Sequence, residues 1–376
     1  MKIVIFGAGR IGRSLIGQVF NRSGYEVVFV DINQQLIDLL NYHKKYKVVI
    51  KDGNDDQMLW IQPVRGINLY DTDRVVDELA GAGITSLSVG QQGLQETIPV
   101  LAKALTVRRQ RFGDCPLDII IAENMRNADV YIRGELRKQL PPDYPVEQLV
   151  GLVETSIGKM VPIMTRKDRD DDPLQVFAES YNSLIVARNG FKNPIPDVPF
   201  LAPKDNIKAW VDRKLFIHNL GHAAVAYLGF TAHPDAVYIC EILEDRRIYR
   251  AARQTMLQSA DILQALYPDE FTLTQLEAHI DDLLRRFMNR SLGDTVFRVG
   301  CDLYRKLGPD DRLAAPIQAA ILTGKPYHLI LDALKAGISF RAKDENGNYF
   351  PSDKLFFEEA QKGAQHILEH VCRIQI

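Results

Sequence analysis

Six residues near the amino terminus, GAGRIG at 7–12, limit the fold of this chain more than any other stretch. They match GxGxxG and lie between an apolar run, KIVIF at 2–6, and a stretch with helical spacing from about Arg10 to Arg22. In such a strand–turn–helix unit the first glycine permits a tight turn, the second lets the backbone approach a pyrophosphate, and the third lets helix and strand pack closely. The pattern therefore predicts a Rossmann-type unit that binds a dinucleotide.

The second apolar run, EVVFVD at 26–31, ends in an acidic residue that bears on the cofactor. Asp31 follows Gly12 by 19 residues, where a carboxylate hydrogen-bonds the ribose hydroxyls of a dinucleotide. Because it would repel a 2′-phosphate, NAD is predicted over NADP, with Arg10 and Arg13 offsetting part of the charge. The alternative is that the glycines serve only a turn. The expected cofactor contacts are Gly7, Ala8, Gly9, Arg10, Ile11, Gly12, Asp31 and, from SVGQQGL at 88–94, Gly90.

The rest of the first half alternates apolar runs with helical patterns, including SLSVG at 86–90 and LDIIIAEN at 117–124. Nearly all-apolar strands separated by helices predict a doubly wound α/β fold, with a parallel sheet covered on both faces. The stretch 174–191 is rich in strand-forming residues and is expected to extend this sheet. The charge run RKDRDDD at 166–172 is expected to be an exposed loop.

A proline cluster at 194–203 is the strongest candidate for a domain boundary. Beyond it, apolar residues recur at three- and four-residue spacing, which indicates helices. The chain has 376 residues, enough for two domains. We therefore expect a Rossmann domain over residues 1–200 and a mainly α-helical substrate domain over residues 201–376.

Composition excludes several classes of function. The formal net charge is −2, which does not suggest binding to nucleic acid or to an anionic membrane. No apolar run approaches the roughly 20 residues that span a bilayer, and MKIVIFGAG reads as a strand rather than a signal peptide. The four cysteines are widely spaced, which predicts reduced thiols in a cytoplasmic protein and no zinc site. The oligomeric state, monomer or weak dimer, is left open.

The stretch KLFIHNLGH at 214–222 places polar side chains among apolar ones. On an α-helix with about 100° per residue, Lys214, His222 and Asn219 lie at roughly 0°, 80° and 140°, so they share one broad side. A lysine whose pKa is lowered by burial can remove the proton of an alcohol during hydride transfer, while an amide stabilises the alkoxide-like oxygen. No metal is then required.

Two simpler interpretations of this stretch remain. Lys214 can extend to solvent along an ordinary helix surface. His218 and His222, spaced i,i+4, can form a metal pair, but no third ligand is evident, so we predict no metal and assign His218 to packing. Asp212 is either a surface charge or a group that tunes the lysine.

The pattern Lys214-x4-Asn219-x2-His222 resembles the signature of the polyol-specific long-chain dehydrogenases, the mannitol dehydrogenase family. The resemblance extends to FGAGRIGRSLIG at 6–17, LDIIIAENM at 117–125 and the long segment at 286–313. It implies a Rossmann domain, a helical carboxy-terminal domain, and metal-independent, NAD-linked oxidation of a sugar alcohol.

The family resemblance also implies roles for individual residues. Lys214 would be the general base, Asn124 and Asn219 would bind the reacting oxygen, and His222 would hydrogen-bond a neighbouring substrate hydroxyl. Within the family the similarity is greatest to members that act on a polyol phosphate. The candidate phosphate-binding cations are Arg286, Arg290, Arg298, Arg305 and Lys306, although a basic patch on helices is often just a solvated face.

Two departures from the family pattern concern the substrate. Gly158-Lys159 stands where the family usually has Asp-Arg, and Arg290 stands where it commonly has proline. The alternatives are therefore the same mechanism on an unphosphorylated polyol or a sugar acid, a β-hydroxyacid dehydrogenase, and a non-catalytic NAD-binding sensor.

Overall fold

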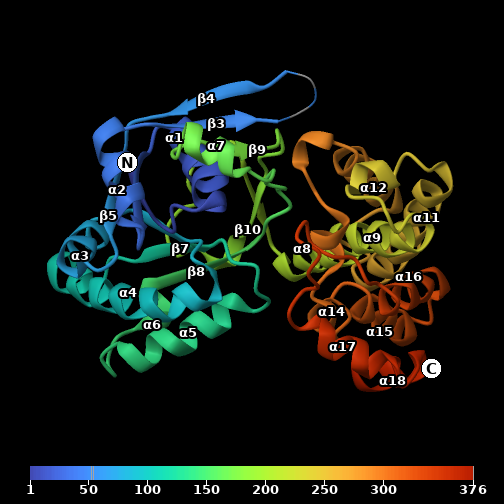
Figure 1. The fold of residues 1–376 in the computed structure, drawn as a ribbon. Coiled ribbons are helices and arrows are strands. Elements are labelled where there is room, and N and C mark those ends of the chain that lie inside the picture. Colours follow the sequence, from blue (N-terminus) through green and yellow to red (C-terminus); the bar gives the residue numbers. More distant parts are fainter. Residues whose placement is uncertain (52, 54, 376) are drawn as a thin grey trace. The chain divides into compact units, whose positions relative to one another are not determined.

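The computed structural model describes residues 1–51, 53 and 55–375, and the chain forms two compact units, Met1–Ile207 and Lys208–Ile376. The amino-terminal unit is built around a sheet of eight strands in the order β11-β10-β8-β7-β6-β1-β2-β5 (Figure 1). Neighbouring strands are parallel except that β10 runs antiparallel to β8. The strands are β1 (Lys2–Phe6), β2 (Glu26–Asp31), β5 (Val64–Asn68), β6 (Ile84–Leu87), β7 (Leu117–Ile121), β8 (Val150–Ser156), β10 (Leu184–Ala187) and β11 (Leu201–Lys204).

Both faces of this sheet are covered, as the apolar strands predict. Along β1, Val4 and Phe6 belong to one core cluster and Ile3 and Ile5 to another, and all four are fully buried. The first cluster includes side chains of α3, α4 and α5, and the second includes side chains of η1, α1 and α2. The helical segments of this unit are η1 (Gly12–Gly17), α1 (Gln18–Arg22), α2 (Gln34–His43), α3 (Thr72–Ala80), α4 (Gly90–Phe112), α5 (Ala128–Gln139), α6 (Val146–Leu149), α7 (Arg166–Asp171) and η2 (Arg188–Gly190).

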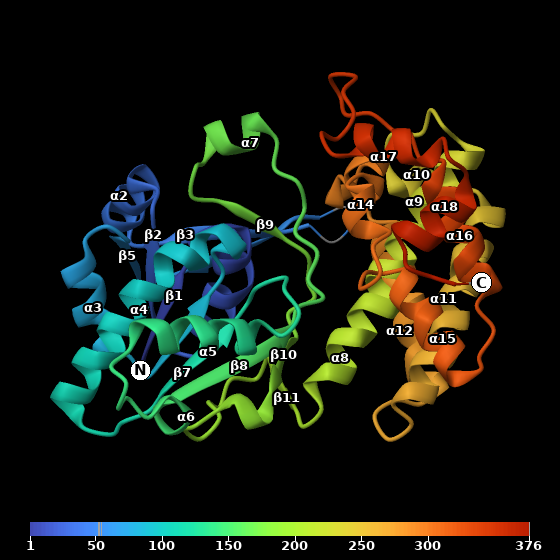
Figure 2. The ribbon, with the colours of Figure 1, turned by 90° about the horizontal axis from the view of Figure 1, so that it is seen from below.

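A second sheet of three strands corrects part of the sequence prediction. It has the order β4-β3-β9 and consists of β3 (Tyr46–Ile50), β4 (Gln57–Ile61) and β9 (Val176–Ala178). All three strands are labelled in Figure 1, and Figure 2 shows β3 and β9 from below. The stretch 174–191 was expected to extend the main sheet, but only β10 joins it. The other strand, β9, pairs in parallel with β3 instead. The local sequence predicts that a segment is a strand, but which strand it pairs with depends on residues far away in the sequence.

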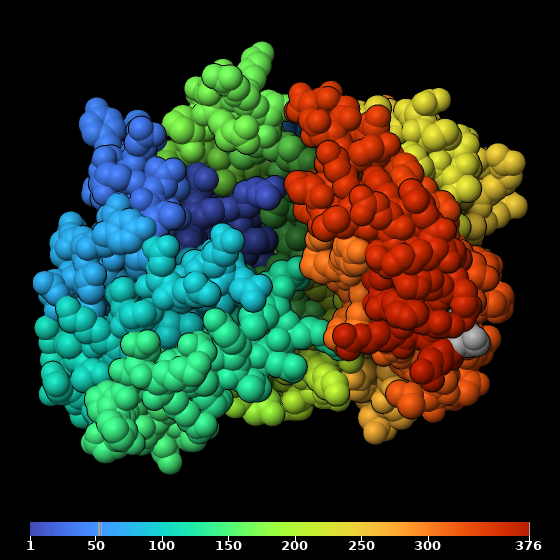
Figure 3. Space-filling model, turned by 60° about the horizontal axis from the view of Figure 1, so that its bottom comes forward, coloured from blue at the N-terminus to red at the C-terminus, as the bar shows by residue number. Residues whose placement is uncertain are grey.

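The charged run at 166–172 is exposed as predicted, but most of it is helical rather than a loop. Thr165 caps helix α7 by accepting a hydrogen bond from the backbone N–H of Asp168, whose carboxylate bonds back to the Thr165 N–H. This capping box stabilises the first turn, and none of the helix residues is buried. In Figure 3 the green segment that carries α7 projects from its unit.

The carboxy-terminal unit is helical, as predicted. Its central helix α9 packs against α11 and α16, and Ala223 to Tyr227 are fully buried. A Cβ at Gly221 would come within 2.5 Å of the Met256 sulfur, so this glycine permits the close approach of α9 and α11. The segments are α8 (Ile207–Arg213), η3 (Lys214–Asn219), α9 (Leu220–Ala232), α10 (Ile239–Ile242), α11 (Arg246–Leu266), α12 (Leu273–Phe287), η4 (Arg290–Leu292), α13 (Val296–Gly300), α14 (Leu303–Lys306), α15 (Ala314–Thr323), α16 (His328–Ile338), α17 (Asp353–Ala360) and α18 (Ala364–His370).

Within the described ranges, every helix is either too short or too polar to cross a bilayer.

Candidate active site

The glycine-rich loop follows β1 and begins the first helical segment, as predicted. Gly7 has φ of +92°, and a Cβ there would lie 2.3 Å from the carbonyl oxygen of Ser88. A Cβ at Gly12 would lie 1.9 Å from the carbonyl oxygen of Gly7. By contrast, no described atom lies within 4 Å of where the Cβ of Gly9 would be. Two of the glycines are thus required by packing, whereas Gly9 faces the open space that a pyrophosphate needs.

Asp31 ends β2 and holds this loop in place. Its Oδ2 accepts a hydrogen bond of 2.7 Å from the Ala8 N–H, and its Oδ1 accepts one of 2.9 Å from the Asn33 N–H. An ionised carboxylate has about four acceptor sites, so each oxygen can still accept a bond from a ribose hydroxyl.

A pocket of about 260 Å³ opens beside these residues. Its lining comes from the glycine loop, the end of β2 and the start of α4, which is where a Rossmann unit binds the adenosine half of a dinucleotide. It is lined by Phe6, Gly7, Gly9, Val30, Asp31, Ile32, Leu69, Ser88, Val89, Gly93, Glu96 and Thr97.

The two arginines of the loop have different roles. Arg10 is exposed. Arg13 is buried, and it donates to the carbonyl oxygens of Ala8 and Leu174, both at 2.7 Å. Burial lowers the pKa of Arg13. The guanidinium of Arg13 thus braces the loop through these two carbonyl oxygens, and the charge of Asp31 acts on it. Ile11 is partly buried against the core.

Gly90 begins α4 with φ of +76°, and its amide has a protein partner. Glu123, two residues beyond β7, accepts from the Val89 N–H at 2.7 Å and from the Gly90 N–H at 3.0 and 3.1 Å. Burial raises the pKa of Glu123. Glu123 was not predicted from the sequence, although it stands next to the predicted Asn124 in the segment AEN. Asn124 itself is exposed on the amino-terminal unit.

Lys214 and Asn219 bound a π-helical segment, η3, which corrects the α-helical angles assumed from the sequence. In a π-helix the backbone bond joins residues i and i+5, so Lys214 and Asn219 stack on one face instead of lying roughly 140° apart. The helix becomes α-helical again at Leu220, and His222 lies in its first turn. Single π-helical turns inside α-helices are frequent at functional sites.

Lys214 has the lowered pKa that the chemistry needs. It is half-buried, and burial, followed by the charge of the Arg312 guanidinium, lowers its pKa to about 8. About one tenth of the amine is therefore uncharged at pH 7, and about half at pH 8. Asp212 proves to be buried rather than a surface charge, and it accepts a hydrogen bond of 2.6 Å from the Tyr267 hydroxyl.

The two histidines of this segment pack around one phenylalanine. The ring of His222 stacks on Phe287 with centroids 4.4 Å apart and planes 6° apart, and His218 meets Phe287 edge-on at 5.7 Å. Burial is the main cause that lowers the pKa of each histidine well below its usual value. Among the described residues, no group of three or more His, Cys, Asp or Glu side chains is arranged to hold a metal ion.

The five predicted phosphate-binding cations differ in burial and in their partners. Arg290 is exposed and pairs with Glu244 at 2.6 Å. Arg305 pairs with Asp302 at 2.5 Å and with Asp311 at 3.3 Å.

Of the other three cations, Arg286 and Lys306 are buried and Arg298 is exposed. Arg286 is buried, 3.6 Å from Asp282, and Arg298 forms an ion pair with Asp294. Lys306 is buried and donates to the carbonyl oxygens of Arg298 and Val299 at 3.1 and 2.7 Å. Burial is the main cause that lowers the pKa of Lys306 to about 8.

Arg312 is a further cation of this region that sequence analysis did not single out. Its side chain is 12% exposed and donates to Asp311 at 2.8 Å. Its charge lowers the pKa values of Lys214, His222 and Lys306. The sequence feature that could have pointed to Arg312 is its position near the end of the segment 286–313, which resembles the family.

Comparison with protein families decides the classification. The mannitol dehydrogenase Rossmann domain matches residues 1–199, and the mannitol dehydrogenase C-terminal domain matches residues 206–373. The chain belongs to the mannitol dehydrogenase family. The family, the fold class and the expected class of enzyme, an NAD-dependent polyol dehydrogenase, are confirmed.

Solved structures share the fold of this mannitol dehydrogenase family member. A ternary complex of Pseudomonas fluorescens mannitol 2-dehydrogenase with NAD and D-mannitol is 18% identical, with 99% of this chain and 87% of that chain covered and a TM-score of 0.75. A substrate-free D-sorbitol dehydrogenase is 15% identical, with 93% and 82% covered and a TM-score of 0.77. At these identities the likeness shows the fold alone.

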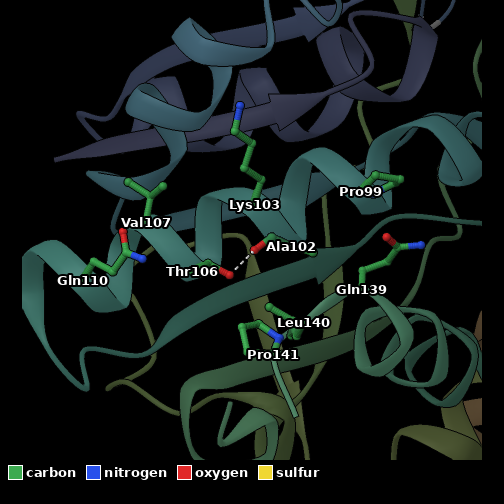
Figure 4. A pocket seen from close by; sticks show the side chains of 9 residues that line it. All are labelled: Pro99, Ala102, Lys103, Thr106, Val107, Gln110, Gln139, Leu140 and Pro141. Atoms are coloured by element: carbon green, nitrogen blue, oxygen red, sulfur yellow. Dashed lines mark hydrogen bonds between the residues drawn. The ribbon is translucent and has the colours of Figure 1, made fainter. Parts of the chain in front are cut away.

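The Rossmann domain of this family member carries a second hollow, on its surface between α4 and the end of α5 (Figure 4). Two of its polar groups have partners: Thr106 donates to the Ala102 carbonyl oxygen and Lys103 pairs with Asp73. None of its lining residues belongs to the glycine loop or to the pocket beside Asp31.

Proposed function

We propose that the protein is a mannitol-1-phosphate 5-dehydrogenase, which interconverts mannitol 1-phosphate and fructose 6-phosphate with NAD. The reaction type rests on one observation above all, the pKa of about 8 of Lys214 on a helix that also carries Asn219 and His222. When bound, NAD supplies the acceptor for the hydride. The side chains of this protein remove the proton of the hydroxyl and stabilise the charge that develops on its oxygen.

In the proposed reaction Lys214, uncharged, removes the proton of the hydroxyl that is being oxidised. The amides of Asn124 and Asn219 donate to that oxygen as its charge develops, which stabilises the transition state. His222 binds a neighbouring hydroxyl. No residue of this scheme requires a metal.

The phosphorylated substrate is supported by the charges around His222. Four cations lower the pKa of this histidine, namely Arg298, Arg312, Lys306 and Arg286. Such an environment favours an anionic ligand over a neutral polyol. A carboxylate would gain from the same cations, which makes a sugar acid the second candidate.

The choice of NAD over NADP is supported by Asp31 and Arg13. The carboxylate of Asp31 faces the pocket beside the glycine loop, and Arg13 is committed to the Ala8 and Leu174 carbonyl oxygens. A 2′-phosphate would therefore meet the negative charge of Asp31, and of the two loop arginines Arg10 is the exposed one.

The experiment is a substrate panel assayed by NADH absorbance. It contains mannitol 1-phosphate, mannitol, sorbitol, fructose 6-phosphate, fructose and fructuronate. We expect kcat/KM for each phosphate to exceed that for its unphosphorylated counterpart by roughly tenfold to 100-fold, the contribution of one or two bonds to a charged group. A higher kcat/KM for mannitol or sorbitol than for mannitol 1-phosphate would contradict a phosphorylated substrate. A higher kcat/KM for fructuronate than for fructose 6-phosphate would favour a uronate reductase. NADH binding without turnover on any of them would identify a sensor.

A further inference from the structure

The imidazole of His222 faces a buried carboxylate for which the proposed reaction has no role. The Nε2 of His222 lies 3.2 Å from the Oδ2 of Asp294, and the two side chains are 13% and 6% exposed. Both atoms are buried, and neither hydrogen-bonds elsewhere among the described residues. The contact is a close approach rather than a well-aligned hydrogen bond, as is common in catalytic sites without substrate. We infer that Asp294 is a positioning residue that sets the tautomer of His222 for the proposed reaction.

Asp294 is itself held in place from several directions. Its other oxygen, Oδ1, forms the ion pair with Arg298, and its backbone carbonyl accepts from the Ile239 N–H at 2.9 Å. The next residue, Thr295, caps α13 by accepting from the Arg298 N–H at 3.1 Å. Arg298 thus holds one oxygen of the carboxylate, while Oδ2 is left to face His222.

The ring of His222 has little freedom to turn away from this carboxylate. Phe287 lies parallel to it at 4.4 Å, which fixes the plane of the ring. A flip about its axis within that plane would replace Nε2 by a carbon atom next to Oδ2, and buried polar groups without partners are costly. The stacking with Phe287 therefore fixes the plane of the His222 ring, and the carboxylate of Asp294 fixes which edge of the ring faces Asp294.

The charges around His222 favour its neutral form. Burial is the main cause that lowers its pKa, followed by Arg298 on α13, Arg312, Lys306 on α14 and Arg286 on α12. His218 on the preceding turn is neutral for the same reason. The carboxylate of Asp294 is the acidic group in direct contact with the ring.

A neutral imidazole has one donor and one acceptor nitrogen, and the bond made by one nitrogen decides the role of the other. A carboxylate accepts, so the proton of His222 resides on Nε2. Nδ1 is then an acceptor. The substrate hydroxyl at His222 must therefore donate its hydrogen, so at this position the site selects a hydroxyl and disfavours a carbonyl oxygen.

The first test measures the tautomer directly and needs no substrate. Nitrogen-15 and carbon-13 chemical shifts of selectively labelled histidines distinguish Nε2–H from Nδ1–H, and His222→Asn assigns the signal. We expect wild-type His222 to be neutral and protonated at Nε2 between pH 6 and 8. Protonation at Nδ1, or a charged ring, would overturn the inference whatever reaction the enzyme catalyses.

The second test replaces the carboxylate. In Asp294→Asn the amide can turn either its donor or its acceptor toward Nε2, so we expect a mixed tautomer and a fall in kcat/KM of roughly 10–100-fold, as is typical when a group that orients a functional histidine is lost. The Kd for NADH should not change. An unchanged histidine spectrum and unchanged kcat/KM would overturn the role of Asp294.

The matched control is Asp245→Asn. Asp245 also contacts a histidine, His233 Nε2 at 3.0 Å, and it caps α11. This pair lies at the surface, so the control variant should lose stability without a change in the tautomer of His222. If Asp245→Asn altered the His222 signal as much as Asp294→Asn does, the effect would be structural and the inference would fail.

Discussion

The Oδ2 of Asp31 accepts a hydrogen bond of 2.7 Å from the backbone N–H of Ala8. This bond ties the end of β2 to the middle of the glycine-rich loop. One carboxylate thereby shapes the loop that would receive a pyrophosphate and borders the pocket that would receive the ribose.

Asp31→Ser should weaken NADH binding by roughly tenfold to 100-fold, the cost of losing hydrogen bonds to a charged group. Binding of NADPH should weaken less or improve, since the repulsion of its 2′-phosphate is removed. Fluorescence titration with both cofactors measures the ratio. Asp38→Ser is the control, because Asp38 is an exposed residue of α2 whose side chain accepts a hydrogen bond from Gln34 on the same helix. An unchanged NADH-to-NADPH ratio in Asp31→Ser would show that Asp31 does not select the cofactor.

Gly9→Ala and Gly12→Ala separate cofactor binding from folding. A Cβ at Gly12 would overlap the Gly7 carbonyl oxygen at 1.9 Å, so Gly12→Ala should lower the free energy of unfolding by about 1–3 kcal/mol. The Gly9 Cβ meets no described atom within 4 Å, so Gly9→Ala should fold with wild-type stability. It should nevertheless bind NADH roughly tenfold more weakly, a loss of about 1.4 kcal/mol. Denaturant unfolding and NADH titration measure the two effects. Equal effects of the two variants on both quantities would contradict the distinction.

The rate of polyol oxidation should follow the protonation state of Lys214. Its pKa is lowered to about 8, and the base is the deprotonated amine, so kcat for oxidation should rise with pH through about 8 and then level off. Arg312 contributes to the lowering. Arg312→Gln should therefore raise the pKa of Lys214 and move the profile to higher pH.

The control for this pH shift is Arg253→Gln, which removes the same charge from an ion pair with Glu277 and Asp281 and should leave the midpoint unchanged. A midpoint that stays in place in Arg312→Gln, or moves to lower pH, would contradict the electrostatic link.

Structural features that depend on residues close together in the sequence could be predicted. The loop at 7–12 and Asp31 obey a fixed spacing, and the helical spacing beyond the proline cluster identified the helical unit. Contacts between distant segments were not predictable, such as Glu123 with Gly90 or Arg312 acting on Lys214. The π-helical turn at Lys214–Asn219 was missed for another reason: the spacing of apolar residues indicates a helix but not which backbone bonds close its turns.

The central claim is that an uncharged Lys214 takes the proton of the alcohol, and the most direct test is the kcat of Lys214→Ala. We expect a loss of roughly 10²–10⁴-fold, the contribution of a general base, with an unchanged Kd for NADH. Added primary amines should restore part of the lost rate, because they replace the missing base. Wild-type turnover in Lys214→Ala with the rising limb of the pH profile intact would contradict the claim.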